Sequence, residues 1–182
     1  MRAANFAIAQ IYSIDQIRDL NKSFENNQIN IGQDKAAKLS VKTSKVKTAK
    51  LKDIKDHLQD FIKFTKYANQ QFFNFDLFPL NDEIIVKHNT YEVGSEYSWH
   101  IDADTASKER DFKLTGLINC SEDSYEGGDL YVFNRGTEFE CKEFKKPGSV
   151  IVFPSFYNHK VTKLLSGHRM TMGLYFPGPK FR

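Results

Sequence analysis

The chain has few of the residues that stabilise small secreted proteins or anchor a protein in a membrane. It contains two cysteines, Cys120 and Cys141, which are too few for a disulfide framework and predict reduced thiols in a reducing compartment. No apolar run approaches the roughly 18 residues that a membrane-spanning helix needs. Asn5 and Gln10 interrupt the N-terminal apolar stretch, so a signal peptide is not expected either. These absences predict a cytoplasmic protein with no membrane partner.

Neither sign of charge is in large excess, because 26 basic and 23 acidic residues leave a net charge of only +3 over 182 residues. A general attraction to polyanions is therefore not expected from the whole chain. Hydrophobic residues make up 40% of the sequence, with 16 Phe and 8 Tyr but a single Trp, which predicts a globular protein with an aromatic-rich core. A chain of this length fits one domain, residues 1–182.

The N-terminal part is predicted to be largely helical after a first strand at residues 6–11. Ser13 and Gln16 have the spacing of a capping box, which predicts a helix from there to about Glu25. A second, long amphipathic helix is predicted from apolar residues that recur at helical spacing and should pack on a sheet. This stripe consists of Leu51, Ile54, Leu58, Phe61, Ile62, Thr65 and Ala68.

Residues 35–55 are the most basic part of the chain, with eight lysines and one acidic residue, Asp53. One interpretation is a surface for an acidic partner or a nucleic-acid backbone. The other is a solvated loop followed by the polar face of the next helix, and this one is favoured. The segment has no interleaved aromatic residues, which argues against binding of single-stranded nucleic acid.

Beyond residue 83 the apolar residues alternate as they do in strands. Eight strands are predicted, at residues 84–91, 97–100, 112–120, 129–133, 139–144, 149–153, 158–164 and 169–176. Short strands separated by turn residues are typical of a closed or sandwiched antiparallel sheet. We therefore expect a mainly β protein of the α+β class, with a cupin-like jelly-roll core, a double-stranded β-helix.

The most chemically specific residues lie on these strands. His100 and Asp102 are two residues apart, so on a strand their side chains point the same way. With a second imidazole, from His159, they form the two-histidine, one-carboxylate set of non-haem Fe(II) oxygenases. Arg169 follows ten residues later and has the guanidinium fork that binds a carboxylate in bidentate geometry. A hairpin is expected to place Arg169 on the strand next to His159, with Thr171 on the same face.

Several motifs recur here in the order of a known family. They are Tyr91-x-x-Gly94-x-x-Tyr97-x-x-His100-x-Asp102, Arg110-Asp111, residues 114–119, Tyr125-Glu126-Gly127-Gly128-Asp129-Leu130, Phe153-Pro154-Ser155 before His159, and Gly167-His168-Arg169. With them, residues 84–176 resemble the Fe(II)/2-oxoglutarate-dependent dioxygenase superfamily, and most closely its prolyl-4-hydroxylase-like branch with the PKHD-type hydroxylases. Residues 1–80 would be the helical support region of this family and residues 81–182 its catalytic core.

The resemblance also implies roles for individual residues. Three would bind Fe(II) and take part in catalysis, namely His100, Asp102 and His159. Arg169 would bind the distal carboxylate of 2-oxoglutarate, and Tyr91 would donate its phenol to the same co-substrate. Leu117 is a departure, because some relatives have a second tyrosine there. Thr115 or Thr171 is then expected to supply the missing hydroxyl.

The reaction that the resemblance implies is hydroxylation of a substrate C–H bond, with O2 consumed and succinate and CO2 released. Asp102 favours hydroxylation, because halogenating relatives lack this carboxylate. Ascorbate is a further cofactor candidate. The expected substrate is a protein or peptide side chain, with proline the default. A small metabolite or a nucleic acid is an alternative substrate. A non-catalytic jelly-roll binding module is the alternative to an enzyme, and the oligomeric state is left open.

Overall fold

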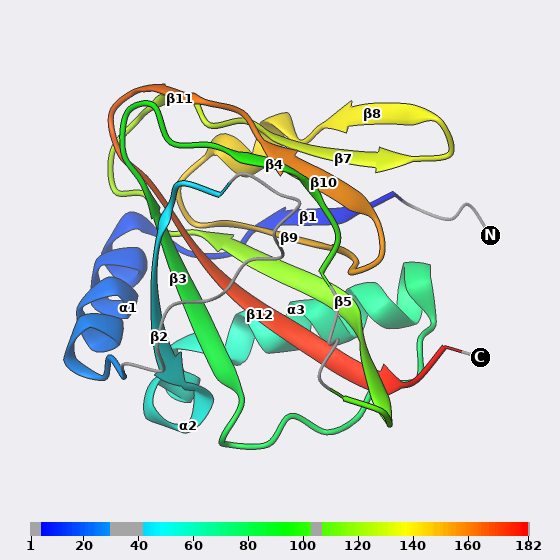
Figure 1. Ribbon diagram of the computed structural model, residues 1–182. Coiled ribbons are helices and arrows are strands. Elements are labelled where there is room, and N and C mark those ends of the chain that lie inside the picture. The colour runs from blue at the N-terminus through cyan, green and yellow to red at the C-terminus, as the bar shows by residue number, and fades with distance from the viewer. Residues whose placement is uncertain (1–4, 30–41, 103–106, 182) are drawn as a thin grey trace.

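Two antiparallel sheets face each other in the computed structural model, and helices cover the outer face of the larger sheet (Figure 1). The structure describes residues 5–29, 42–102 and 107–181. The helices are α1 (Ile14–Asn26), α2 (Leu51–Ile54) and α3 (Gln59–Ala68). The strands are β1 (Ala7–Gln10), β2 (Lys45–Lys50), β3 (Ile85–Tyr91), β4 (Tyr97–His100), β5 (Arg110–Asn119), β6 (Glu126–Gly127), β7 (Leu130–Asn134), β8 (Thr137–Glu140), β9 (Ser149–Pro154), β10 (Asn158–Val161), β11 (Leu164–Ser166) and β12 (Arg169–Pro179).

The larger sheet has six strands in the order β1-β9-β5-β12-β3-β2, and the smaller has four in the order β4-β10-β7-β8. Strands β11 and β6 form a separate short pair. All the pairs are antiparallel, as expected for the predicted double-stranded β-helix. Within the described residues, no helix is long and apolar enough to span a membrane.

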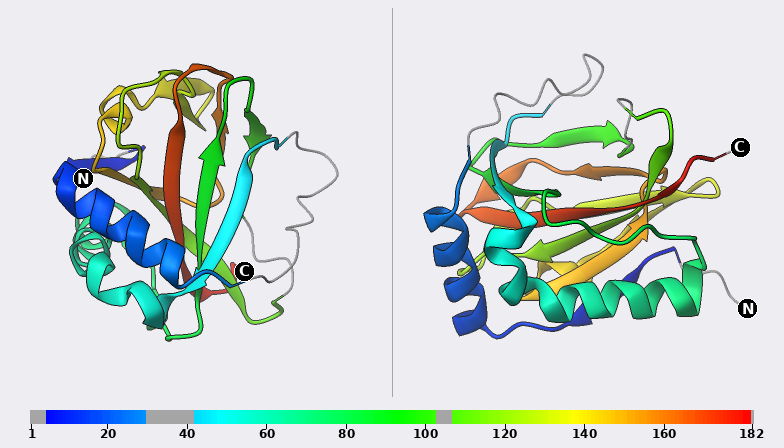
Figure 2. Two further views of the ribbon diagram at one scale, coloured as in Figure 1. Left: turned by 90° about the vertical axis from the view of Figure 1, so that its left-hand side faces the viewer. Right: turned by 90° about the horizontal axis from the view of Figure 1, so that it is seen from below.

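Side-chain alternation on β12 separates the core into two layers. Met172 and Leu174 point outward and belong to the cluster that packs against the helices. Arg169 and Thr171 have the opposite parity and therefore face the smaller sheet. Figure 2 shows the helices on one side of the larger sheet, which leaves its other side to face the smaller one. The space between the two sheets is thus where the predicted site residues of β12 point.

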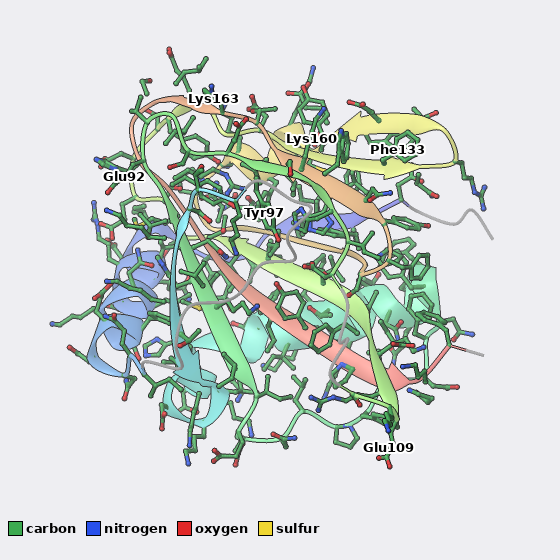
Figure 3. The ribbon with its side chains drawn as sticks, in the orientation of Figure 1. Glu92, Tyr97, Glu109, Phe133, Lys160 and Lys163 are labelled. Carbon is green, nitrogen blue, oxygen red and sulfur yellow. The ribbon has the colours of Figure 1, made fainter. Side chains whose placement is uncertain are left out.

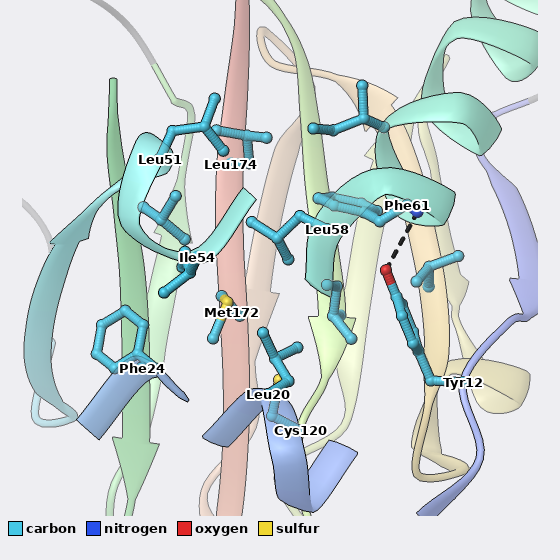
Figure 4. Packing of buried hydrophobic residues seen from close by; sticks show 14 of the residues in the cluster. Tyr12, Leu20, Phe24, Leu51, Ile54, Leu58, Phe61, Cys120, Met172 and Leu174 are labelled. Carbon is cyan, nitrogen blue, oxygen red and sulfur yellow. Dashed lines mark hydrogen bonds between the residues drawn. The ribbon is translucent and has the colours of Figure 1, made fainter. Parts of the chain in front are cut away.

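The predicted apolar stripe of residues 51–68 is buried throughout, but the predicted single helix is wrong. A 3-10 turn at Lys55–Leu58 separates α2 from α3. The reason is the hydroxyl of Tyr12, which donates to the carbonyl of His57 (3.1 Å) and accepts from the N–H of Phe61 (3.1 Å). These two backbone groups would pair directly in an α-helix, so the hydroxyl is inserted into the helical hydrogen-bond ladder (Figure 4).

The lysine-rich segment also differs from the prediction where the structure describes it. Residues 45–50 form β2, an edge strand of the larger sheet, rather than a loop or a helix face. Lysines are common on exposed edge strands, where they discourage pairing with other chains. Residues 35–41 lie outside the described residues.

Two predicted strands of the core are shorter than expected. The one at residues 139–144 ends at Glu140, and a 3-10 turn follows at Lys142–Lys145. The one at residues 158–164 divides into β10 and β11, which pair in different sheets. Cys120 and Cys141 are both free, as predicted, and both are buried.

Candidate metal and co-substrate site

The three predicted metal ligands meet at the end of the smaller sheet. His100 is the last residue of β4, and it lies opposite His159 of β10 in the register of the two strands. Asp102 follows two residues later, held by a hydrogen bond from its N–H to the carbonyl of Ser155 (2.9 Å). The ligand atoms of the three side chains all lie within 4.8 Å of one another. The sequence prediction that they converge is confirmed by this geometry.

Each histidine ring is oriented by a contact between its Nδ1 and the backbone carbonyl two residues earlier. Nδ1 of His100 lies 2.8 Å from the carbonyl of Ser98, and Nδ1 of His159 lies 3.0 Å from the carbonyl of Tyr157. A carbonyl only accepts, so Nδ1 carries a proton in each ring, and in the neutral imidazole Nε2 is then the nitrogen with the free lone pair. Burial, with His159 nearby, lowers the pKa of His100 to about 4. The neutral imidazole that a metal requires is therefore the stable form of His100 near neutral pH.

Tyr97, one of the motif residues, packs against the His100 ring. The two rings stack with centroids 3.5 Å apart and planes 13° apart. Tyr97 is labelled in Figure 3, as is Lys160, whose ammonium lies 4.4 Å from the ring centre of Trp99. Tyr97 is thus part of the support of a metal ligand, whereas Trp99 packs with Lys160.

Asp102 is held by its side chain as well as by its backbone. The hydroxyl of Thr115 donates to Oδ2 of Asp102 (2.8 Å) and lies 2.9 Å from the hydroxyl of Ser155. Thr115 and Ser155 are both fully buried. The structure thus places the Thr115 hydroxyl on the Asp102 carboxylate, and the contact of Thr115 or Thr171 with the co-substrate stays a prediction.

Arg169 reaches the site from a different direction than predicted. Its strand, β12, lies between β5 and β3 in the larger sheet, and β10 with His159 lies in the smaller sheet. The expected hairpin is therefore wrong, because the chain first forms β11 and then crosses between the sheets. Arg169 instead pairs in register with Tyr91 of β3, and its guanidinium carbon lies 4.8 Å from the centre of the Tyr91 ring.

The Arg169 side chain is only 1% exposed, yet its hydrogen-bonding capacity is largely unused. Among the described residues, Nε and Nη1 have no hydrogen-bond partner. Buried guanidinium nitrogens without hydrogen-bond partners are costly, so this geometry suits a bound anion. Burial also raises the pKa of Tyr91, which keeps its phenol protonated as a hydrogen-bond donor.

The structure explains why glycine occupies position 128 of the Gly127-Gly128 motif, next to this arginine. Gly128 has a φ of +61°, and a Cβ built on it would lie 2.8 Å from Cδ of Arg169. A side chain at this position would therefore be strained and would displace the guanidinium. Thr171, which is buried on the same face as Arg169, stays a predicted co-substrate contact.

Comparison with known proteins places this geometry in context. Residues 86–177 match the family model described as the 2OG-Fe(II) oxygenase superfamily, which covers half of the chain. A PKHD-type hydroxylase of Synechococcus sp. (strain CC9605) is 41% identical over 79 residues, which are 42% of this chain and 34% of that protein. A PKHD-type hydroxylase of Prochlorococcus marinus (strain AS9601) is 28% identical over 170 residues, 91% of this chain and 75% of that protein. The matched stretch thus spans about a third of the Synechococcus relative and three quarters of the Prochlorococcus one.

A solved structure shows the same fold. The viral collagen prolyl hydroxylase of Paramecium Bursaria Chlorella virus-1, in its 2OG complex, superposes with a TM-score of 0.69 at 15% identity, covering 96% of this chain and 97% of that one. At this identity the likeness supports the jelly-roll fold alone. The family match shows that the chain belongs to the 2OG-Fe(II) oxygenase superfamily, and the meeting of His100, Asp102 and His159 agrees with it.

Proposed function

We propose that this protein is an Fe(II)- and 2-oxoglutarate-dependent dioxygenase that hydroxylates a C–H bond of its substrate and releases succinate and CO2. The observation that carries the proposal is the pairing of a two-histidine, one-carboxylate cluster with a buried arginine whose Nε and Nη1 lack partners among the described residues. The first fits a ferrous ion, and the second fits the far carboxylate of a dicarboxylic acid.

Each residue has a defined task in this proposal. Nε2 of His100, Nε2 of His159 and a carboxylate oxygen of Asp102 would hold the metal, because the other polar atoms of these residues are already engaged. Bound Fe(II) would supply the activation of O2. Arg169 would fix the distal carboxylate of 2-oxoglutarate, and the protonated phenol of Tyr91 would donate to it. Their burial excludes water from that end of the co-substrate.

For the primary substrate we propose a protein or peptide side chain, with proline as the first candidate. The support is that the relatives are PKHD-type hydroxylases and that one fold neighbour is a viral collagen prolyl hydroxylase. We also propose that the protein is cytoplasmic and that it uses ascorbate as a further cofactor.

A nucleic-acid substrate has less support from the structure than from the sequence. Five lysines of the basic segment form surface ion pairs with acidic residues. The pairs are Lys45–Glu92, Lys47–Glu25, Lys50–Glu83, Lys52–Glu83 and Lys55–Asp82. Their charge is therefore largely balanced locally, which weakens the attraction to a phosphate backbone.

The proposal is tested by measuring succinate formation and by mass spectrometry of candidate peptides. Succinate should form only when Fe(II) and 2-oxoglutarate are both present, and a substrate peptide should gain one oxygen. His100→Ala and Asp102→Ala should abolish both signals, whereas Lys160→Ala, a change on the outer face of the smaller sheet, should retain them. Wild-type turnover in either metal-ligand variant would exclude the proposed site.

A further inference from the structure

Oδ2 of Asp102 accepts a hydrogen bond from the side chain of Thr115 and lies 3.4 Å from Nε2 of His159, and the contact with Thr115 fixes the direction of a short chain of hydroxyls. An ionised carboxylate can only accept, so Thr115 must donate its single hydroxyl proton to Oδ2 of Asp102 (2.8 Å). The hydroxyl of Ser155, 2.9 Å from that of Thr115, must then donate to Thr115. The protons therefore run from Ser155 through Thr115 to Asp102.

This chain of hydroxyls connects the two sheets at the metal end. Thr115 lies on β5 of the larger sheet, opposite Phe153 of β9, and Ser155 directly follows β9. Asp102 lies two residues after the end of β4 in the smaller sheet, and its N–H donates to the carbonyl of Ser155 (2.9 Å). Ser155 thus holds the Asp102 backbone directly and its carboxylate through Thr115.

The burial of the two hydroxyls gives these contacts their strength. Thr115 and Ser155 are both 0% exposed, so water does not compete for their hydrogen bonds. Successive hydrogen bonds in a low-dielectric interior polarise one another, and a bond to an ionised acceptor is stronger than one between neutral groups. These bonds hold Oδ2 of the Asp102 carboxylate toward Thr115.

We infer that Thr115 and Ser155 are positioning residues for the Asp102 carboxylate, and that they preorganise it for a divalent metal ion. The inference rests on the proposed function in that Asp102 is taken as a metal ligand. It assigns to Thr115 a role toward the metal and not toward 2-oxoglutarate. Thr115 acts through Asp102, and Ser155 acts through Thr115, so removal of either should weaken metal binding by a graded amount.

The experiment measures Mn(II) affinity without turnover, by following the loss of the free-ion electron paramagnetic resonance signal. Thr115→Val should bind Mn(II) about 10- to 100-fold more weakly than wild type, the range typical for loss of a contact that orients a metal ligand. Ser155→Ala should show a smaller loss, because Thr115 can still donate to Asp102. Thr115→Ser keeps the hydroxyl and should restore affinity.

The matched control is Thr65→Val, since Thr65 is equally buried but bonds the carbonyl of Phe61 in α3, far along the chain from the site. This variant should lose stability and keep wild-type Mn(II) affinity. If Thr115→Val does not fold, the comparison of Ser155→Ala with wild type still decides, because the inference requires a measurable loss there.

A second readout separates the two roles considered for Thr115. At saturating Mn(II), 2-oxoglutarate affinity should be the same in Thr115→Val and wild type if the hydroxyl serves only Asp102. A selective loss of 2-oxoglutarate affinity with unchanged Mn(II) affinity would overturn the inference and return Thr115 to the co-substrate. Absence of Mn(II) binding by the wild type would instead refute the proposed function itself.

Discussion

Replacement of Arg169 by Met should leave the ligand-free protein at least as stable as wild type. The guanidinium is 1% exposed, and its Nε and Nη1 have no partner among the described residues. Removing an unsatisfied buried polar group relieves about 1–3 kcal/mol, more when the group is charged. The lost contact with the Tyr91 ring offsets about 0.5–2 kcal/mol of this gain. Because relief is the larger effect, the melting temperature should stay the same or rise.

The same change should remove the response to co-substrate. At a 2-oxoglutarate concentration of about 100 Kd with Mn(II), wild type should gain about 2.7 kcal/mol. For a domain of this size that corresponds to roughly 5–11 °C in Tm. Breaking a buried charge pair costs about 3–5 kcal/mol, or more than about 100-fold in affinity. At the same ligand concentration, the Arg169→Met protein should therefore shift by only about 1 °C.

The assay is a thermal unfolding series with Mn(II), with and without 2-oxoglutarate. Arg18→Met is the control, because Arg18 is a half-exposed arginine that pairs with Asp15 and Glu122 on the surface. It should respond to the ligand as wild type does. The reasoning is refuted if Arg169→Met destabilises the ligand-free protein by several kcal/mol and still shows the full ligand shift.

Three further predictions concern the helices, the glycine motif and a buried histidine. Tyr12→Phe should lower the free energy of unfolding by about 1–3 kcal/mol, because it leaves the buried N–H of Phe61 without its acceptor. The measurement is unfolding in urea, and an unchanged midpoint would show that the N–H of Phe61 bonds the carbonyl of His57 directly instead. Gly128→Ala should weaken 2-oxoglutarate binding by displacing Arg169. Gly136→Ala is the control and should cost only backbone strain, because Gly136 has a φ of +79° and a Cβ there would have nothing within 4 Å. Equal 2-oxoglutarate affinities of the two variants in isothermal titration would contradict this. His88 is buried against Phe24, near Glu25 and Lys47, and burial lowers its pKa from 6.5 to about 4, so the unfolded state binds the extra proton between these values. Stability should therefore fall by about 3 kcal/mol as the pH drops from 6.5 to 4, and His88→Leu should flatten this decline where exposed His57→Gln does not; parallel pH profiles for wild type and His88→Leu would argue against it.

Local patterns in the sequence predicted the elements that depend on local physics. The capping box at Ser13 and Gln16 forms as expected, with the Ser13 N–H donating to the Gln16 side chain (2.9 Å). The helical stripe is buried along its whole length, because apolar spacing determines which side faces the sheet. The break between α2 and α3 was not predictable, since it comes from Tyr12, which lies about forty residues earlier in the chain.

The candidate site shows the same division. The two-residue spacing of His100 and Asp102 predicted that they share a face, and the structure confirms their meeting with His159. The origin of Arg169 on the facing sheet was missed, because a ten-residue offset does not distinguish a hairpin from a crossover between sheets. The contact of Thr115 with Asp102 depends on how β5 of one sheet faces the end of β4 in the other, which no local pattern specifies.

The most direct test of the central claim is an anaerobic crystal structure with Mn(II) and 2-oxoglutarate. We expect one metal ion bonded to Nε2 of His100, Nε2 of His159 and a carboxylate oxygen of Asp102. We also expect the distal carboxylate of 2-oxoglutarate within hydrogen-bond distance of Nε and Nη1 of Arg169. A metal ion held elsewhere, or a co-substrate carboxylate that leaves Arg169 without a partner, would contradict it.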